Sequence, residues 1–283
     1  MKHLHFKMIT AMPEVARHAE ACGVDTIFID MEIRGKSERQ GHLDTQKSEH
    51  TTNDISRIAR VLTRAELMAR INPPWEGTAA EVEAAIAAGA GRLMLPMFRT
   101  CDEVAEFKSA VAGRVPVTLL VETASGLARL PVILPLLQVG DRVHFGLNDL
   151  CIDMGLDFLF EVLGGRLLDG PAALCRDAGV PFGIGGVGRI GMGDVPADWI
   201  ISEHVRLGSE WVILSRAFHG GATSLDRLVD QLDLAAELSA IHQCYRDLGA
   251  ADSTLLREYQ RRLACKAAEI GRQRSSARWL QAS

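Results

Sequence analysis

The chain has 283 residues, 47% of them hydrophobic, and a formal net charge of -5 at pH 7. Its acidic pI near 6.0 argues against a nucleic-acid-binding protein, which usually carries a strongly basic face. The mean hydropathy of +0.07 leaves enough apolar material for a large core and argues against disorder.

Targeting and redox signals are sparse. The first residues lack the long apolar core of a signal peptide, and the longest apolar run, at 130–137, is too short to span a bilayer. The six cysteines are scattered without a CxxC pair, which favours reduced thiols over a disulfide framework or a zinc site. We therefore expect a soluble, cytoplasmic protein that binds neither nucleic acid nor a membrane.

Short β-like runs alternate with helical stretches. The predicted strands are residues 5–10, 26–32, 66–72, 92–97, 117–122, 142–147, 181–187 and 211–215. Among the predicted helices, 13–22 begins at Pro13 and ends before Gly23, 77–90 is amphipathic, and Thr100 caps the next one. This alternation predicts an α/β protein with a (β/α)8 TIM barrel. An open doubly wound sheet is the alternative, but no GxGxxG turn follows the first strand.

From Ser224 onward the pattern is helical. We expect residues 1–250 to form the barrel domain and residues 251–283 a C-terminal helical tail. The tail is rich in arginine, which fits a solvated or subunit-packing helix. An anion-binding or partner-binding tail is the alternative.

Two apolar runs each lead into a carboxylate. Residues 117–122 end in Glu122, and the run that starts at residue 142 reaches Asp149. A carboxylate at the mouth of a buried strand is costly unless it is paired or coordinates a metal. Glu122 and Asp149 are therefore predicted ligands of a hard divalent cation.

Polar side chains also end the second and third predicted strands. Asp30 and Glu32 are two residues apart, so both are expected on one face, where they repel unless a cation, a donor or a shared proton intervenes. Arg70 and Asn72 repeat this spacing, and a guanidinium suits a carboxylate or an oxyanion. The alternatives are a hydrogen-bonded structural acid pair and a salt bridge from Arg70 to it.

Other candidates lie in loops. His50, in a polar stretch, has the intrinsic pKa of a catalytic base, but a loop histidine is more often simply solvated. The glycine-rich residues 183–193 could bind phosphate through backbone N–H groups, although tight packing of the strand end is favoured. The remaining histidines carry no functional prediction, even though His3 and His5 have a spacing that could bind a metal.

With these residues in place, the chain resembles the HpcH/HpaI aldolase and citrate lyase β-subunit family of the pyruvate/phosphoenolpyruvate barrel superfamily. The matching motifs, in the same order over roughly residues 5–220, are FIDME at 28–32, ARINPPWEG at 69–77, AGAGRLMLPMF at 88–98, LLVETASG at 119–126, HFGLNDL at 144–150, FGIGGVGRIG at 182–191 and EHVRLGSEWVILSR at 203–216.

The resemblance implies a site as well as a fold. It implies Mg²⁺ or Mn²⁺ on Glu122 and Asp149, with the substrate's 2-oxo acid group completing the coordination. The substrate-binding residues would be Arg70, Asn72, Pro96 and Asn148. In the aldolase branch a histidine after the acidic strand acts as the base, which corresponds to His50, although residues 33–49 separate it from Glu32.

The function that this resemblance implies is that of a metal-dependent carbon–carbon lyase. It would cleave or form a 4-hydroxy-2-oxo acid through a pyruvate-type enolate, with catalytic roles for Arg70, His50, Asp30 and Glu32. Either His50 or a metal-bound water would remove the 4-hydroxyl proton. A lyase acting on a CoA or carrier thioester is the first alternative, and a non-catalytic subunit that binds a 2-oxo acid is the second. The family also implies a homo-oligomer, a trimer or hexamer.

Overall fold

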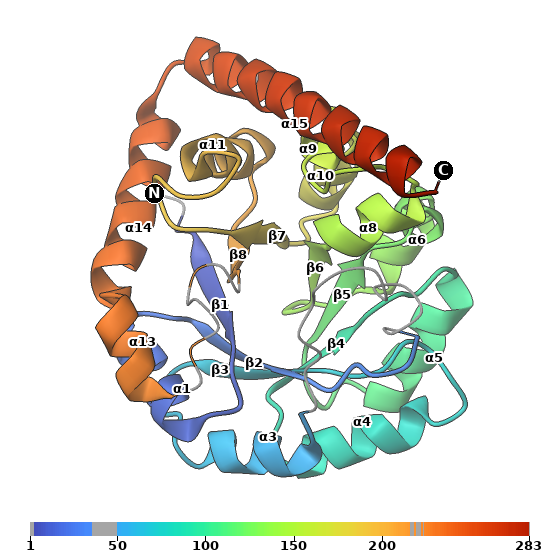
Figure 1. The fold of residues 1–283 in the computed structure, drawn as a ribbon. Helices are drawn as coiled ribbons and strands as arrows, with labels where there is room; N and C mark the ends of the chain where they lie inside the picture. The colour runs from blue at the N-terminus through green and yellow to red at the C-terminus, as the bar shows by residue number, and fades with distance from the viewer. Residues whose placement is uncertain (1–2, 36–49, 216–217, 219–221, 223, 283) are drawn as a thin grey trace.

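Eight parallel strands close into a barrel in chain order, with β1 paired to β8 (Figure 1). The computed structural model describes residues 3–35, 50–215, 218, 222 and 224–282. The strands are β1 (His5–Ile9), β2 (Thr26–Asp30), β3 (Glu66–Arg70), β4 (Arg92–Leu95), β5 (Val117–Val121), β6 (Arg142–Phe145), β7 (Phe182–Val187) and β8 (Trp211–Leu214). The predicted TIM barrel is therefore confirmed.

Helices surround this barrel and cover its outer face (Figure 1). They are α1 (Pro13–Cys22), α3 (Thr52–Ala59), α4 (Thr78–Ala87), α5 (Cys101–Val111), α6 (Ala124–Ala128), α7 (Leu130–Ile133), η1 (Leu134–Leu136), α8 (Leu147–Asp153), α9 (Glu161–Gly164), α10 (Asp169–Asp177), α11 (Ala197–Leu207), α13 (Leu225–Gln231), α14 (Leu234–Ala250) and α15 (Ser253–Ala282). The main hydrophobic core lies between strands and helices, which explains why most strands are apolar on both faces.

Local sequence signals mark several helix ends correctly. Pro13 occupies the first turn of α1, and Gly23 ends that helix with a φ of 104°, a left-handed conformation that suits glycine. Thr100 caps α5 by accepting the N–H of Glu103, whose side chain bonds back in a capping box. Helix α3 is not among the predicted helices, because its polar start at Thr51 resembles a loop although it also forms a capping box.

All predicted strands except 181–187 extend too far at their carboxyl ends. Strand β2 ends at Asp30 and β3 at Arg70, so Glu32 and Asn72 lie in the loops beyond. The N–H of Glu32 turns onto Oδ1 of Asp30, 3.2 Å away, instead of continuing the ladder with the neighbouring strand. The prediction that Asp30 and Glu32 share one face of a strand is therefore wrong, and the same holds for Arg70 and Asn72.

The barrel interior is layered. Phe28, Met68, Met94 and Leu120 form a buried apolar cluster in its middle. Because side chains alternate along a strand, residues two positions on from these point inward at the mouth, as Arg70 and Glu122 do. Residues two positions before them form a polar floor at the other end, the layer that contains Glu66, Arg92 and Thr118.

The C-terminal helices pack on the barrel. Helix α15 lies across α9 and α11 (Figure 1), and its Leu263 and Ala267 are buried in the main core. A Cβ on Gly164 of α9 would come 2.9 Å from Cα of Ala264, so glycine permits this close approach. This confirms a helical extension beyond the barrel. Among the described residues, no helix has both the length and the apolar character needed to cross a membrane.

Candidate active site

A cavity of about 480 Å³ opens at the carboxyl ends of the barrel strands. Three predicted site residues line it, Arg70, Glu122 and Asp149, together with the predicted substrate residue Asn148. Its other walls are largely apolar, and Phe158 and Phe160 are among them. An apolar pocket with a few convergent charged groups is the usual form of a small-molecule site.

Glu122 follows β5 directly and is 2% exposed. Its Oε1 accepts the N–H of Met97, 3.1 Å away, in the segment that follows the neighbouring strand β4. Met97 has a φ of 54°, a left-handed conformation that costs a residue other than glycine about 1 kcal/mol. Such strain persists where the surroundings enforce it and is concentrated at functional sites.

Asp149 reaches the same cavity from a different element than predicted. Strand β6 ends at Phe145, and Asp149 lies in the first turn of helix α8 instead of at a strand end. Gly146 precedes α8, and Asp149, 8% exposed, forms part of the cavity wall. The prediction of its strand position is wrong, whereas the two carboxylates do border one cavity.

Gly146 leaves the space that Glu122 occupies. A Cβ at this position would lie 2.8 Å from Oε2 of Glu122 and 3.0 Å from its Cβ. Glu122 and Asp149 thus offer two buried carboxylates at one cavity, and carboxylate oxygens are ligands that Mg²⁺ and Mn²⁺ prefer. The residues present therefore fit the divalent ion that the sequence implied.

Arg70 is anchored by the acidic residues of the second strand and its loop. Its Nε and Nη2 donate to Asp30 at 2.9 and 2.8 Å, and Nη1 lies 3.3 Å from Glu32. Burial opposes its charge, but the carboxylates of Asp30 and Glu32 outweigh this effect and raise the pKa of Arg70. The alternative salt bridge from Arg70 to the acid pair is therefore formed, and Arg70 also borders the cavity.

Comparison with known proteins identifies the chain's relatives. A model of the HpcH/HpaI aldolase/citrate lyase family matches residues 8–158, more than half of the 283 residues. The chain belongs to the HpcH/HpaI aldolase/citrate lyase family. Members of this family are mostly metal-dependent aldolases and lyases. The comparison with curated proteins gave no match.

Solved structures support the fold. An HpcH/HpaI aldolase/citrate lyase family protein from Burkholderia cenocepacia J2315 is 18% identical, with a TM-score of 0.58 over 87% of this chain and 95% of that one. An HpcH/HpaI aldolase from Desulfitobacterium hafniense DCB-2 is 16% identical, with a TM-score of 0.58 over 89% and 95%. At these identities the similarity establishes the shared barrel alone.

The other predicted residues of this HpcH/HpaI family member lie outside the cavity lining. His50 accepts the N–H of Asp30 on its Nδ1, 3.1 Å away, so the neutral ring carries its proton on Nε2. Asn72 holds the loop after β2, since its Oδ1 accepts the N–H groups of Ile33 and Arg34 and its Nδ2 donates to Glu81. Pro96 is buried just after β4. Their functional roles stay predictions.

The glycine-rich stretch contributes to the cavity wall. Gly185 and Gly186 line it from β7, and Gly188 and Gly193 from the loop that follows. Gly185 has a φ of 42°, and a Cβ there would lie 2.7 Å from Cδ1 of Leu147. Tight packing, the favoured interpretation, fits this part of the segment, and phosphate binding stays a prediction.

His144, which received no functional prediction, also lines the cavity. Its Nε2 donates to the carbonyl oxygen of Gly185 at 3.1 Å, and its Nδ1 lies 3.4 Å from Nζ of Lys7. Burial and then the charge of Lys7 hold the pKa of His144 well below its ordinary value, so the ring is neutral. The alternation of Arg142 and His144 with apolar Val143 and Phe145 already indicated inward-facing polar positions.

Exchanging Gly146 for Ala tests the fit of the carboxylates. The added methyl group should displace the Glu122 carboxylate and weaken Mn²⁺ binding by about 10- to 100-fold, the range seen when the surroundings of a ligand change. Gly170→Ala is the matched control, because a Cβ there meets nothing within 4 Å. Mn²⁺ titration followed by electron paramagnetic resonance measures both, and equal affinities in the two variants would contradict the arrangement.

Proposed function

We propose that this protein is a divalent-metal-dependent carbon–carbon lyase that cleaves a 4-hydroxy-2-oxo acid into an aldehyde and a pyruvate-type enolate. The observation that carries the proposal is the convergence of Glu122, Asp149 and Arg70 on one cavity. Membership in the HpcH/HpaI aldolase/citrate lyase family supports the reaction class.

Glu122 and Asp149 would hold Mg²⁺ or Mn²⁺. Such an ion acts as a Lewis acid that polarises a 2-oxo acid and stabilises the negative charge of its enolate. Glu122 is kept in place by the N–H of Met97, and Asp149 by its position on helix α8. Neither side chain can swing out easily, because both are buried.

Arg70 would bind the substrate oxygens on which charge develops. Its raised pKa keeps it protonated, and its contacts with Asp30 and Glu32 hold the guanidinium in one orientation. A fixed donor aimed at a developing oxyanion lowers the barrier without reorganising during the reaction. In this proposal Asp30 and Glu32 position Arg70, and Asn148 contributes an amide at the cavity wall.

His50 is the proposed acceptor of the 4-hydroxyl proton. A neutral imidazole has a pKa suited to this transfer. Because its Nδ1 accepts the N–H of Asp30, base catalysis at Nε2 requires the other tautomer and the loss of that hydrogen bond. Because His50 is also absent from the described cavity lining, the ring has to change partners and move toward the substrate when it binds.

The walls of the cavity bear on the aldehyde half of the substrate. Phe158, Leu159 and Phe160 form an apolar side, which favours an aldehyde with an apolar portion.

A second candidate function is a citrate lyase-like reaction on a thioester. Arg274 at the cavity wall favours it, because its guanidinium could pair with a phosphate group.

A coupled assay for pyruvate tests the two functions. The enzyme is offered a panel of 4-hydroxy-2-oxo acids with Mg²⁺ or Mn²⁺, and the assay is repeated with EDTA. Metal-dependent pyruvate release is expected, with a preference for apolar aldehyde halves. Full activity in EDTA would refute the metal-dependent mechanism, and cleavage of CoA esters alone would establish the second candidate.

Assembly and domain division are also proposals. We propose a homo-oligomer, a trimer or hexamer, in which helices beyond the barrel take part in subunit contacts. Residues 1–250 would form the catalytic barrel unit and residues 251–283 the extension. Light scattering of the purified protein measures the number of subunits, and a monomer at micromolar concentration would refute the proposed assembly.

A further inference from the structure

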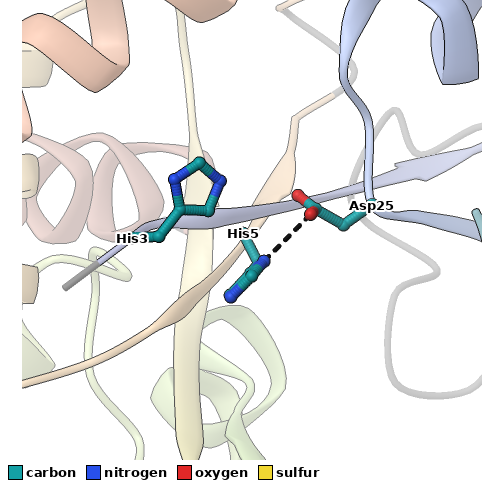
Figure 2. A group of neighbouring side chains, drawn as sticks. All are labelled: His3, His5 and Asp25. Atoms are coloured by element: carbon teal, nitrogen blue, oxygen red, sulfur yellow. Dashed lines mark hydrogen bonds and ion pairs between the residues drawn. The ribbon is translucent and has the colours of Figure 1, made fainter. Parts of the chain in front are cut away.

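A second group of potential metal ligands lies at the opposite end of the barrel from the cavity. His3 precedes β1, His5 begins that strand, and Asp25 comes directly before β2. One ligand atom from each lies within 4.8 Å of the other two. Figure 2 shows the three side chains together at the start of β1. Because cavity residues lie at the carboxyl ends of the strands, this group is separate from the candidate active site.

The two inner members of the group are already at ligand spacing. Nδ1 of His5 lies 2.9 Å from Oδ1 of Asp25, the contact dashed in Figure 2. In a tetrahedral site with metal–ligand distances near 2.1 Å, neighbouring ligand atoms are about 3.4 Å apart. A small outward shift of either group would therefore let a metal ion replace the proton that they share.

The surroundings hold both groups in place. Oδ2 of Asp25 accepts the N–H of Phe6 at 2.8 Å, which fixes the carboxylate against β1. The His5 ring stacks on Trp211, with ring centroids 4.3 Å apart and planes inclined by 21°. Anchoring of a ligand by a backbone group or a packed side chain is typical of sites that bind metal firmly.

His3 completes the set from the solvent side. Its ring is exposed and lies 4.8 Å from the ring of His5 and 4.3 Å from that of His242. His242 itself donates from Nε2 to the carbonyl oxygen of Leu4 at 2.9 Å, so it supports the start of the strand. The exposed position of His3 leaves an approach for an ion from solvent.

We propose that His3, His5 and Asp25 form a second cation site, which binds a borderline transition metal ion of the Zn²⁺ class. Two imidazoles and one carboxylate suit Zn²⁺ or Co²⁺, whereas Mg²⁺ prefers oxygen ligands and fits the carboxylate pair at the other end. The ion would join the chain before β1 to the start of β2, and water would fill its remaining position. Its role would be to stabilise the amino-terminal edge of the barrel.

Zn²⁺ and Co²⁺ titrations test this proposal in the presence of saturating Mg²⁺. Calorimetry should show one Zn²⁺ site whose affinity falls about tenfold or more in His3→Ala and in His5→Ala. Co²⁺ should quench the fluorescence of Trp211, which stacks on His5, and in the variants this quenching should require about tenfold or more higher Co²⁺ concentrations. His18→Ala is the matched control, since His18 lies on α1 and contacts Cys22.

The outcomes separate this site from the candidate active site. Glu122→Gln should leave Zn²⁺ binding unchanged, and Zn²⁺ should raise the melting temperature of the natural protein more than that of His3→Ala. His3 is exposed, so its replacement does not compromise folding. Zn²⁺ binding that survives both histidine replacements, or that disappears in Glu122→Gln, would overturn the proposal, as would no binding at all.

Discussion

Glu122→Gln and Asp149→Asn are each expected to lower metal-dependent pyruvate release by about 10³-fold or more. Each change keeps the size of the side chain but removes the negative charge that a divalent ion requires. In Glu122→Gln the side-chain carbonyl oxygen can still accept the N–H of Met97, so the loop after β4 should keep its position. Steady-state rates at saturating Mn²⁺ and Mn²⁺ affinities are the measurements.

Asp153→Asn is the control for this prediction. Asp153 lies one helical turn beyond Asp149 on α8, and its carboxylate contacts Arg99 and the N–H of Ala124, at 2.7 and 2.8 Å. It is absent from the described lining of the cavity, so its amide should retain activity within a few-fold. Equal losses in Asp149→Asn and Asp153→Asn would point to damage of α8 instead of loss of a ligand, and unchanged rates in both ligand variants would refute the metal site.

The barrel was predictable because its signals are local and repeat. Each strand is a short apolar run, because its side chains point alternately into the lumen and toward the surrounding helices. Helix ends were marked by residues with a direct physical role, such as Gly23 in its left-handed conformation and Thr100 in its capping box. Eight such strands alternating with helices then indicated a closed barrel over an open sheet.

The carboxyl ends of the strands were not predictable to the residue. Glu32 and Asp149 follow apolar runs, so the pattern alone places both at the mouth of a strand. In the structure, the N–H of Glu32 bonds to Asp30 and the chain at Asp149 is already helical. These turns depend on side chain to backbone contacts and on the close approach of Gly146 to Glu122, which become visible only in three dimensions.

The polar floor of the barrel was missed for a related reason. His144 lies level with Leu120, one layer above the floor, and is 137 residues from Lys7 of the floor, yet its Nδ1 is 3.4 Å from Nζ of Lys7. Arg92 and Arg142 meet on Glu66 in the floor layer, at 2.9 Å each. Alternation indicates which residues face inward, but partners across a barrel depend on the register of all eight strands.

Lys7→Met is expected to stabilise the protein most at neutral and acidic pH. Lys7 is fully buried, and its Nζ has only a neutral imidazole within contact distance among the described polar groups. Burial, and then repulsion by Arg142 and Arg92, lowers its pKa from the ordinary 10.5 to about 7, although Glu66 opposes this. Methionine has a similar length and carries no charge to desolvate.

The pH dependence identifies the cause of that stabilisation. Between the folded pKa of about 7 and the unfolded value of 10.5, only the unfolded chain holds the proton on Lys7, so stability rises with pH. Below this window Lys7 is protonated in both the folded and the unfolded state, so the folded protein carries the full free-energy cost of the buried charge. From about pH 6 to about pH 8.5, the natural protein should gain about 2 kcal/mol relative to Lys7→Met. Urea unfolding of both proteins at the two pH values measures this difference, in which the other titrating groups cancel.

Lys266→Met is the control, which shows whether the pH-dependent effect of Lys7→Met comes from removing a buried charge or from replacing a lysine anywhere. Lys266 is partly exposed and paired with Glu269 at 3.2 Å, so its replacement should change stability by a similar small amount at both pH values. A Lys7→Met difference that is equally independent of pH would mean that Lys7 keeps its charge in the folded barrel. The floor would then have to contain a compensating negative charge besides Glu66, since a lone ammonium between two guanidinium groups is strongly disfavoured in a buried layer.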